Sequence, residues 1–380
     1  MKCMIDRSAP MPWGNAPPSA RSRHSRLRQR EMTPGRSVSL SGSRIAGVVS
    51  CVPAQQVDNR SFMTRFGDKA AEIEKMTGVR QRHWVDDDMT TADLCQRAAE
   101  RLLDQLGWER DSVDAIFLVT QTPDFRLPAT ACALQGRLGL GQHALAFDVN
   151  LGCSGYPYGL WLAMTTIASG TARRVLLLAG DTISRTVDPE DRSTVMLFGD
   201  AGTATAVEAD AEGAANFILG TDGTGERRLI IAGGAYRRSK DSAEGIGTNA
   251  DALYMDGGAI FNFTLATVPK LVSATVERAG GAEVFDAFLF HQANAFMLRH
   301  LAKKSKLPSD RVPINIDRFG NTSSATIPLL MTTDIAERLT STKTRLGMFG
   351  FGVGFSWGSV DIMVNPLACA ETIYFAGLHE

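Results

Sequence analysis

A short strand-like segment occurs twice in this chain, once in each half. The segment Asp114-Ala-Ile-Phe-Leu-Val-Thr-Gln121 is echoed by Asp286-Ala-Phe-Leu-Phe-His-Gln292, which begins 172 positions later. A second match, at nearly the same separation, pairs residues 147–154 with residues 316–322. Each match alone is weak, but together they predict that the two halves of the chain share one structural plan.

The second match contains a polar turn in each half. An apolar residue and an aspartate come before the turn, which is Gly152-Cys-Ser154 in the first half and Gly320-Asn-Thr322 in the second. We expect a strand to precede each turn, so that Cys153 and Asn321 occupy equivalent places. A duplicated structure would bring such turns together near one pseudo-axis, and this is a structural reason to expect a shared site.

Apolar runs alternate with helix-like stretches through the body of the chain, which predicts an α/β fold. The expected strands are 45–49, 115–119, 144–147, 174–179 and 203–207, and the expected helices are 91–106, 129–138 and 156–169. These strands are apolar almost throughout. Such strands are typical of a sheet that helices cover on both faces.

Composition argues against several classes of protein. The chain has 380 residues, with 40 Lys and Arg against 41 Asp and Glu, so binding of nucleic acid over the whole surface is disfavoured. No apolar run approaches the length that crosses a bilayer, so we expect no membrane partner. Six cysteines without a CxxC pair do not form a disulfide framework. We therefore expect a reduced, cytoplasmic protein.

The N-terminal segment differs in composition from the rest. Residues 1–40 contain eight basic and two acidic residues, are rich in Pro and Ser, and show no apolar periodicity. Three interpretations compete: a targeting peptide, a basic arm for an acidic partner, or a start placed too early, with translation beginning at Met32. We favour the last. The expected organisation lists a leader, two halves and a tail: 1–42, 43–213, 214–364 and 365–380.

Cys153 has the setting of a catalytic nucleophile. The stretch 156–169 behind it is apolar on nearly every side, which predicts a buried helix. Pro157 is tolerated only in the first turn, so this helix must begin close to Cys153. The positive end of a helix favours a thiolate. The other cysteines fit the ordinary reading of a small buried hydrophobic residue.

Two further residues complete a possible reactive set. His291 ends the apolar run Phe288-Leu-Phe290, and a polar residue at the end of such a strand points into the crevice where α/β proteins bind ligands. Asn321 lies in a turn that opens onto a helix, where it would ordinarily be a cap or turn residue. A Cys, a His and an Asn at strand ends together indicate nucleophilic catalysis.

Four motifs of this chain resemble the signatures of β-ketoacyl-acyl-carrier-protein synthase III. They are Gly-Cys-Ser-Gly155, His-Gln-Ala-Asn294, Gly-Asn-Thr-Ser323 and Phe-Ser-Trp-Gly-Ser359. The segments 188–192 and 198–200 are also similar to family segments, and the resemblance covers about residues 43–364 in order. It implies the thiolase-like fold, in which two duplicated βαβαβαββ-type halves form five layers, α-β-α-β-α, and it implies a homodimer.

The resemblance also implies a mechanism. Cys153 would take an acyl group from an acyl-coenzyme A or acyl-carrier-protein (acyl-ACP) donor, and malonyl-ACP would then lose carbon dioxide and condense with it. His291 and Asn321 would donate hydrogen bonds to the enolate oxygen, and the backbone N–H groups of Cys153 and Val353 would hold the tetrahedral oxyanion. The product is a 3-oxoacyl thioester for fatty acid or related secondary-metabolite biosynthesis. No cofactor and no metal are expected.

Several positions depart from the family pattern. Glu72 and Met76 stand where the housekeeping enzymes carry a Trp and an Arg that grip coenzyme A, and Phe296 replaces an Arg that aids carrier-protein docking. The resemblance retains Arg192, for coenzyme A binding. It also retains a basic pair, Lys303 and Lys304, for the acidic helix of a carrier protein, although such a pair is equally typical of a solvated helix face.

Two departures concern the reaction centre and the acyl pocket. Val353 lies between Gly352 and Gly354, where three glycines are commoner, and a β-branched residue poorly tolerates positive φ. Leu127 replaces a Phe whose ring narrows the acyl pocket across the dimer interface. These changes indicate a specialised relative that takes a donor longer than acetyl, rather than the acetyl-coenzyme A-primed initiation enzyme.

Other functions fit parts of the same pattern. An acyltransferase of this fold would pass the acyl group from Cys153 to a non-malonyl acceptor, but it has less use for Asn321. A non-catalytic dimer partner or carrier-protein binding module has no need of Cys153, His291 and Asn321 together. A papain-like hydrolase shares these residue types, yet nothing around Cys153 resembles its local signature.

Overall fold

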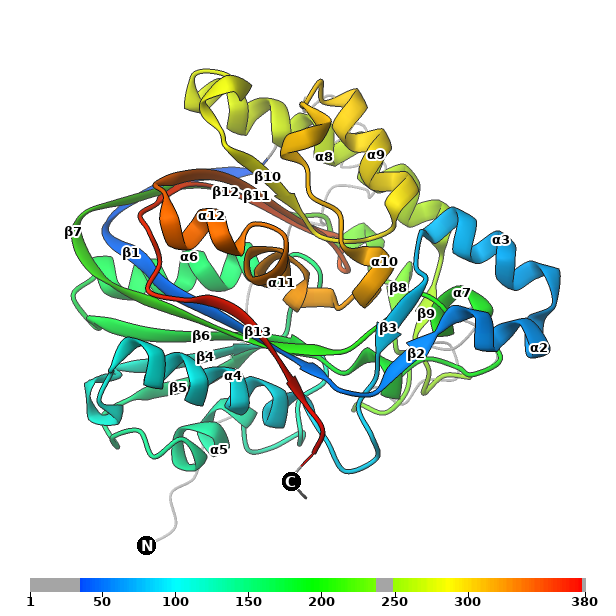
Figure 1. The fold of residues 1–380 in the computed structure, drawn as a ribbon, viewed down its shortest axis with the longest axis horizontal. Helices are drawn as coiled ribbons and strands as arrows, with labels where there is room; N and C mark the ends of the chain where they lie inside the picture. Colours follow the sequence, from blue (N-terminus) through cyan, green and yellow to red (C-terminus); the bar gives the residue numbers. More distant parts are fainter. Residues whose placement is uncertain (1–34, 237–248, 378–380) are drawn as a thin grey trace, which may run out of the picture. The chain divides into compact units, whose positions relative to one another are not determined.

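A mixed sheet of nine strands organises residues 35–236 and 249–377, which the computed structural model describes (Figure 1). These residues belong to one unit, Pro34–Glu380, and residues 1–34 of the expected leader lie outside the described part. Seven strands follow the order β10-β11-β12-β7-β6-β4-β5, and β1 joins β7 and β13. The strands are β1 (Arg36–Pro53), β4 (Ala115–Val119), β5 (Leu145–Val149), β6 (Arg174–Asp181), β7 (Ala201–Thr221), β10 (Ala287–Phe290), β11 (Thr344–Gly352), β12 (Ser356–Val364) and β13 (Ala370–Phe375).

The two matching sequence segments form equivalent strands. In the first half, β4 pairs in parallel with β6, which pairs antiparallel with β7. In the second half, β10 pairs in parallel with β11, which pairs antiparallel with β12. The expected repetition of one plan is therefore present in the strand pairing. Two very long strands, β1 and β7, run through both halves and join them into one sheet.

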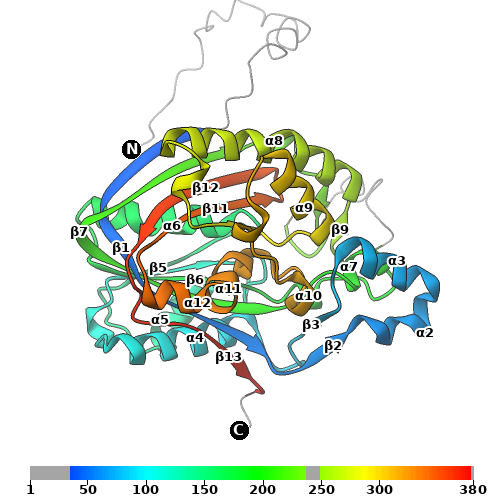
Figure 2. The same cartoon turned by 45° about the horizontal axis from the view of Figure 1, so that its top comes forward.

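Helices cover this sheet in layers, as expected for the thiolase-like arrangement (Figures 1 and 2). On one outer face lie α4 (Thr91–Leu106) and α5 (Thr130–Arg137), and on the other lie α8 (Gly257–Ala279) and α9 (Ala295–Lys304). Between the two half-sheets lie α6 (Gly155–Ala168) and α11 (Thr326–Thr333). The five-layer order is confirmed.

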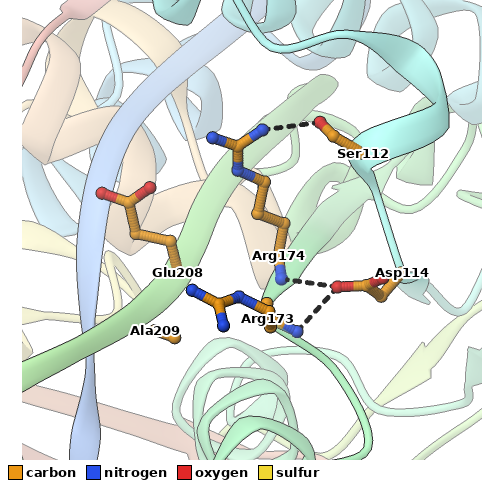
Figure 3. Close-up of a pocket in the computed structure, with 6 residues that line it drawn as sticks. All are labelled: Ser112, Asp114, Arg173, Arg174, Glu208 and Ala209. Atoms are coloured by element: carbon orange, nitrogen blue, oxygen red, sulfur yellow. Dashed lines mark hydrogen bonds between the residues drawn. The ribbon is translucent and has the colours of Figure 1, made fainter.

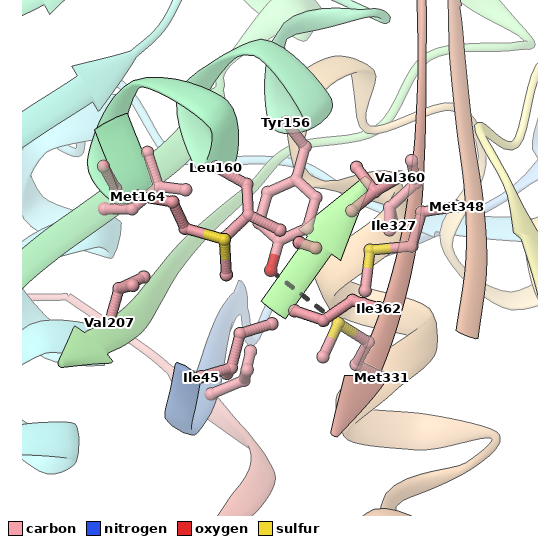
Figure 4. Close-up of a cluster of buried hydrophobic side chains, with 14 of the residues drawn as sticks. Ile45, Tyr156, Leu160, Met164, Val207, Ile327, Met331, Met348, Val360 and Ile362 are labelled. Carbon is pink, nitrogen blue, oxygen red and sulfur yellow. Dashed lines mark hydrogen bonds between the residues drawn. The ribbon is translucent and has the colours of Figure 1, made fainter. Parts of the chain in front are cut away.

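The middle layer holds a core that contains residues of both halves (Figure 4). Leu160 of α6 and Ile327 of α11 are at most 1% exposed. Tyr156 is buried as well, and its hydroxyl lies 3.1 Å from Thr205 Oγ1 and 3.7 Å from Met331 Sδ. A buried phenol needs such partners, because an unpaired hydroxyl in an apolar core is costly.

Local signals explain where the helices begin and end. α4 begins with a capping box in which Thr90 and Asp93 satisfy each other's backbone N–H groups, and it ends at Gly107 in the left-handed region. The cap is Thr90, and the helix itself begins at Thr91, the first residue of the expected helix 91–106. α6 begins at Gly155, so Pro157 lies in its first turn, as predicted.

The structure corrects three expectations about boundaries. Residues 316–319 form a single helical turn, α10, and not the strand that the repeat suggested before Asn321. Residues 370–375 of the expected tail form β13, which pairs in parallel with β1. β1 itself begins at Arg36, inside the expected leader, and β7 crosses the expected boundary at 213. The division into 1–42, 43–213, 214–364 and 365–380 is therefore misplaced at these points.

α8 is the one helix of the described residues that is long and apolar enough, by length and composition alone, to cross a membrane. In the structure, however, it covers the outer face of the second half. Phe263, Val268 and Leu271 are buried in the cluster that it shares with β11, β12 and α9. One such helix is weak evidence of a membrane span, because helices of globular proteins pass the same test, and about a third (33%) of the apolar window of α8 is buried within the fold.

The remaining elements form the side of the unit where α3 meets α7 and α9. They are β2 (Gln56–Asp58), α2 (Met63–Phe66), α3 (Asp68–Thr77), β3 (Gln81–His83), α7 (Arg192–Val195), β8 (Leu229–Ile230), β9 (Tyr254–Met255) and α10 (Ile316–Phe319). α12 (Ala336–Ser341) instead packs against α11 and β13.

Candidate active site

Cys153 lies at the meeting point of the two halves, directly before the N-cap of α6. Its side chain is 8% exposed. The last residue of β11, Gly352, approaches so closely that a Cβ placed there would lie 2.6 Å from Cys153 Cβ and 3.1 Å from its Sγ. The chain thus needs glycine at 352 to let a strand of the second half rest against the thiol of the first.

The surroundings of Cys153 keep its thiol protonated at rest. Burial raises the pKa of Cys153 to about 12, and the charge of Asp181 adds to this rise. Hydrogen bonds from the Ser323 side chain and from the backbone N–H groups of Cys153 and Val353 act in the opposite direction. These two backbone N–H groups are the pair predicted to hold an oxyanion.

His291 follows β10 and is 2% exposed. Its Nδ1 lies 2.8 Å from Thr326 Oγ1, at the start of α11, and its ring meets Phe351 edge-on with centroids 5.6 Å apart. Burial lowers the pKa of His291 to about 3, so the imidazole is neutral at neutral pH. The Thr326 hydroxyl also lies 3.0 Å from Ser323 O and donates to it. Its single hydrogen serves one acceptor at a time, so Nε2 carries the ring hydrogen, as a neutral donor, only when the hydroxyl turns to Nδ1.

Asn321 is held on both its backbone and its side chain. Its backbone N–H donates to Leu197 O at 2.9 Å, and its carbonyl accepts from Gly199 N at 3.1 Å. The side-chain Oδ1 accepts from the Ser323 N–H at 2.9 Å. Because the amide oxygen is engaged, the NH2 group is the end of the side chain that remains to donate. Asn321 is 4% exposed, so this donor is well ordered by its surroundings.

The hairpin tip that carries Val353 is tied to the nucleophile loop. Ser356 donates from Oγ to Val353 O at 2.7 Å, and the same Oγ lies 2.6 Å from Ser154 Oγ. Positive φ, which a valine poorly tolerates, occurs at Gly354, where φ is 127°. Among the described non-glycine residues only Lys306 and Ser323 have positive φ, so Val353 does not. Val353 therefore keeps ordinary backbone geometry while it presents its N–H group.

The other predicted site residues lie at the surface. Arg192 on α7 is exposed, as are Lys303 and Lys304 at the end of α9, where Lys304 donates to Leu265 O at 2.8 Å. Leu127 is 75% exposed in this single chain. No described contact joins these four residues to Cys153, His291 or Asn321.

Three polar residues near Cys153 escaped the sequence reasoning. Asp181 ends β6 and is fully buried, the Ser323 side chain lowers the pKa of the Cys153 thiol, and Thr326 is the partner of His291. Asp181 carried a usable signal, because it closes an apolar strand just as His291 does. Ser323 and Thr326 gave none, since Ser and Thr near a helix start are ordinarily capping residues.

Two surface pockets differ in their relation to this site. A polar pocket of about 290 Å³ is lined by Arg173, Arg174, Asp114 and Glu208, and none of the predicted site residues lines it (Figure 3). A second pocket, of about 390 Å³, is lined by Gln121 and residues 122–126, close to Leu127. Gln121 Oε1 would overlap a side chain at Gly152, so this pocket borders the loop of Cys153.

Comparison with known proteins identifies the family that the sequence motifs resemble. Two family models match, namely 3-oxoacyl-[acyl-carrier-protein (ACP)] synthase III over residues 147–223 and its C-terminal part over residues 279–363. The chain is similar to a 3-oxoacyl-(acyl-carrier protein) synthase from Burkholderia xenovorans, with 53% identity, a TM-score of 0.88, and coverage of 90% of this chain and 100% of that one.

More distant relatives keep the fold and extend the range of pathways. A 3-oxoacyl-(acyl carrier protein) synthase III from Pseudomonas aeruginosa is 34% identical, with a TM-score of 0.76 and coverage of 86% and 99% of the two chains. A priming β-ketosynthase of a polyketide biosynthetic pathway is 28% identical, with a TM-score of 0.76 and coverage of 86% and 98%.

Proposed function

Since the chain belongs to the 3-oxoacyl-[acyl-carrier-protein] synthase III family, we propose that Cys153, His291 and Asn321 are the catalytic residues of its reaction. The enzyme is an acyltransferase that condenses an acyl thioester with malonyl-ACP in fatty acid biosynthesis. The observation that carries the assignment of residues is the close approach of Gly352, the residue before Val353, to the buried side chain of Cys153.

The first half-reaction loads the nucleophile. Cys153 Sγ attacks the carbonyl carbon of the donor thioester, and the negative charge moves to the carbonyl oxygen, which accepts hydrogen bonds from the N–H groups of Cys153 and Val353. Collapse of this intermediate breaks the donor's C–S bond. The carrier leaves as a free thiol with the hydrogen that Cys153 gave up, and the acyl group remains on Sγ.

The second half-reaction forms the carbon–carbon bond. Loss of carbon dioxide from the malonyl thioester leaves an enolate, whose oxygen accepts hydrogen bonds from Nε2 of His291 and the amide of Asn321. The carbanion attacks the acyl carbon on Cys153, and the sulfur leaves as the 3-oxoacyl thioester forms. Because burial keeps His291 neutral, it acts here as a hydrogen-bond donor and needs no proton exchange with solvent.

We propose a donor longer than acetyl, carried by coenzyme A or by ACP. Leu127 supports this, because a leucine occupies the position at which the family has a ring that narrows the pocket. Its 75% exposure in a single chain also suits a residue that completes the pocket of a neighbouring subunit. The exposed Arg192, Lys303 and Lys304 are proposed to bind the carrier, since cations attract both coenzyme A phosphates and an acidic ACP helix.

We further propose a homodimer in the cytoplasm. β5 is the last strand of the sheet order, so one of its edges has no neighbour within the described residues. Leu145 and Phe147 on this edge strand are 44% and 39% exposed, which is typical of a strand that a second subunit covers. The five cysteines of the described residues are free thiols, in keeping with a reducing compartment.

Intact mass measurement tests the assignment. Wild type, Cys153→Ala and Cys132→Ala are incubated with a series of acyl-coenzyme A and acyl-ACP thioesters. Cys132, an exposed thiol on α5, is the matched control. An acyl adduct on wild type and Cys132→Ala, absent from Cys153→Ala, would support the nucleophile, and discharge by malonyl-ACP as a 3-oxoacyl product would support condensation. An adduct that malonyl-ACP cannot discharge would favour acyl transfer to another acceptor.

A further inference from the structure

Residues 195–200, which belong to the first half of the chain, hold the backbone of Asn321 in the second half. Asn321 pairs with Phe198 in an isolated parallel bridge. Its N–H group donates to Leu197 O at 2.9 Å, and its carbonyl accepts from the Gly199 N–H at 3.1 Å. The place from which Asn321 presents its side-chain amide therefore depends on where these residues, the 195–200 segment, lie.

Arg82 lies in β3 and Trp84 directly follows this strand, and the side chains of both bond to the segment. Arg82 Nη2 donates to Val195 O at 2.6 Å, and Trp84 Nε1 donates to Phe198 O at 2.9 Å. The first bond holds the start of the segment, and the second holds the residue that pairs with Asn321 in the bridge. Two neighbouring side chains thus fix the stretch of backbone on which Asn321 rests.

Arg82 is fully buried, which is rare for a charged side chain. Its guanidinium lies over the rings of Phe62 and Trp84, 5.1 and 4.7 Å from their centroids, and its Nη1 donates to Asn59 Oδ1. Asn59 in turn donates from Nδ2 to Met196 O at 3.0 Å. None of these partners is a carboxylate, and the Nε of Arg82 has no hydrogen-bond partner among the described residues. Burying a cation in this way is costly, which points to a role for its two forked donors besides packing.

The Cβ of Arg82 lies against two glycines, one in the segment and one in the turn of Asn321. A Cβ placed at Gly199 or at Gly320 would in each case lie 3.2 Å from Arg82 Cβ. A Cβ at Gly320 would also lie 2.7 Å from Leu197 O. The backbones of the turn and of the segment therefore meet directly, with no side chain between them to absorb a shift. A displacement of the segment is passed on to Asn321.

We propose that Arg82 is a positioning residue for Asn321: by holding the 195–200 segment, it fixes the place from which the Asn321 amide donates to the enolate oxygen. This deepens the proposed function, on which the catalytic role of Asn321 rests. No described contact joins Arg82 to Cys153 or His291. We therefore expect Arg82 to act on decarboxylation of the malonyl thioester and not on acylation of the thiol.

Arg82→Met tests the structural part of this proposal, because methionine occupies much of the same space but donates no hydrogen bond. Hydrogen exchange followed by peptide mass reports on the backbone of residues 316–322 and needs no substrate. We expect the Asn321 N–H to exchange about tenfold faster in Arg82→Met, because the carbonyl that accepts from it is no longer held in place. Exchange in residues 145–155, around Cys153, should stay as in wild type.

Two rates test the catalytic part. Release of carbon dioxide from malonyl-ACP should fall about 10–100-fold in Arg82→Met, less than or equal to the loss on removing the amide itself. Acylation of Cys153, followed by intact mass with acyl-coenzyme A probes from acetyl to dodecanoyl, should change less than about twofold. In an Asn321→Ala background, Arg82→Met should slow decarboxylation by less than about twofold, because the amide that it positions is absent.

Arg174→Met is the matched control. Arg174 also lies over a tryptophan, with its guanidinium 4.8 Å from the Trp108 ring centroid, but it lines the polar pocket of Figure 3, away from the predicted site residues. This variant should leave both rates and the exchange of residues 316–322 unchanged.

The outcomes separate positioning from general packing. A folded Arg82→Met protein with unchanged exchange in residues 316–322 would overturn the proposal, as would an equal loss of decarboxylation with and without the Asn321 amide. If Arg82→Met does not fold, Trp84→Phe is the second variant, since it keeps a ring at this position and removes only the donor to Phe198 O. It should speed the same exchange and slow decarboxylation about threefold, and wild-type behaviour in both would refute the proposal.

The same data distinguish a failure of the proposed function. If Asn321→Ala releases carbon dioxide at the wild-type rate while Arg82→Met still speeds the exchange of residues 316–322, the catalytic role proposed for Asn321 is wrong and the structural role of Arg82 is supported.

Discussion

The contact between Gly352 and Cys153 permits a quantitative prediction for Gly352→Ala. A methyl group at 352 would lie 2.6 Å from Cys153 Cβ and 3.1 Å from Sγ. Carbon atoms in contact ordinarily lie about 3.5–4.0 Å apart, so either the Cys153 loop or the end of β11 must move by about 1 Å. Gly352 does not have positive φ, and the effect therefore comes from the contact and not from backbone strain.

A displacement of about 1 Å is large for a nucleophile. The sulfur must stay within reach of the donor carbonyl while the Cys153 and Val353 N–H groups face the developing oxyanion. A misplacement of this size costs on the order of 10² in rate. We therefore expect the single-turnover rate of acylation of Gly352→Ala to fall about 100-fold, with the donor's binding affinity changed much less.

Quenched-flow mass spectrometry measures this rate directly, and thermal unfolding checks that the variant is folded. Gly136→Ala, on α5, is the matched control, because a Cβ at that position meets no atom within 4 Å. It should acylate like wild type. A folded Gly352→Ala protein that acylates at the wild-type rate would show that the strand end does not set the position of the thiol.

Three further predictions concern other parts of the site. His291→Ala and Asn321→Ala should each slow malonyl decarboxylation by about 10²–10³ while acyl-enzyme formation is largely kept, as released carbon dioxide and intact mass would report. Burial lowers the pKa of His291 from 6.5 to about 3, so the unfolded chain binds the extra proton between these values. The free energy of unfolding should then fall as pH drops from about 6.5 to about 3, by at most about 1.4 kcal/mol per pH unit for this residue, and urea unfolding of His291→Gln should show a shallower slope. Leu127→Phe should shift the preferred donor to a shorter chain in an acylation assay, and an unchanged chain-length profile would remove Leu127 from the acyl pocket.

The fold was predictable because its signals are local and repeated. The expected apolar strands at 115–119 and 174–179 and the helix start near Cys153 each follow from a few neighbouring residues. Residues 316–319 did not follow this rule. The segment Ile316-Asp317 matches Phe147-Asp148 in sequence, yet residues 316–319 make a helical turn, in which the N–H groups of residues 318–320 bond to the carbonyls of Asn315 and Ile316. The edge of β10 that corresponds to the β5 side of β4 has no strand beside it within the described residues.

The site was predictable only where short sequence motifs mark its residues. Cys153, His291 and Asn321 stand at element ends that the sequence marks, whereas Asp181 and Ser324 meet through a hydrogen bond between segments 143 residues apart. A single sequence does not show which serine contacts which carboxylate. That pairing appears only when β6 and the Asn321 turn are placed side by side.

The two long strands limit how this enzyme can move. β1 and β7 each continue from one half-sheet into the other, although their register jumps from Ser43–Ala209 to Ser41–Ala214 where the halves meet. A rotation of one half against the other would have to bend both strands at this irregularity and disturb the core that α6 and α11 share. We therefore expect loops around the active site to move when a bulky thioester enters. A protein cut at 213 would lose the continuous strand β7, which joins the half that carries Cys153 to the half that carries Gly352.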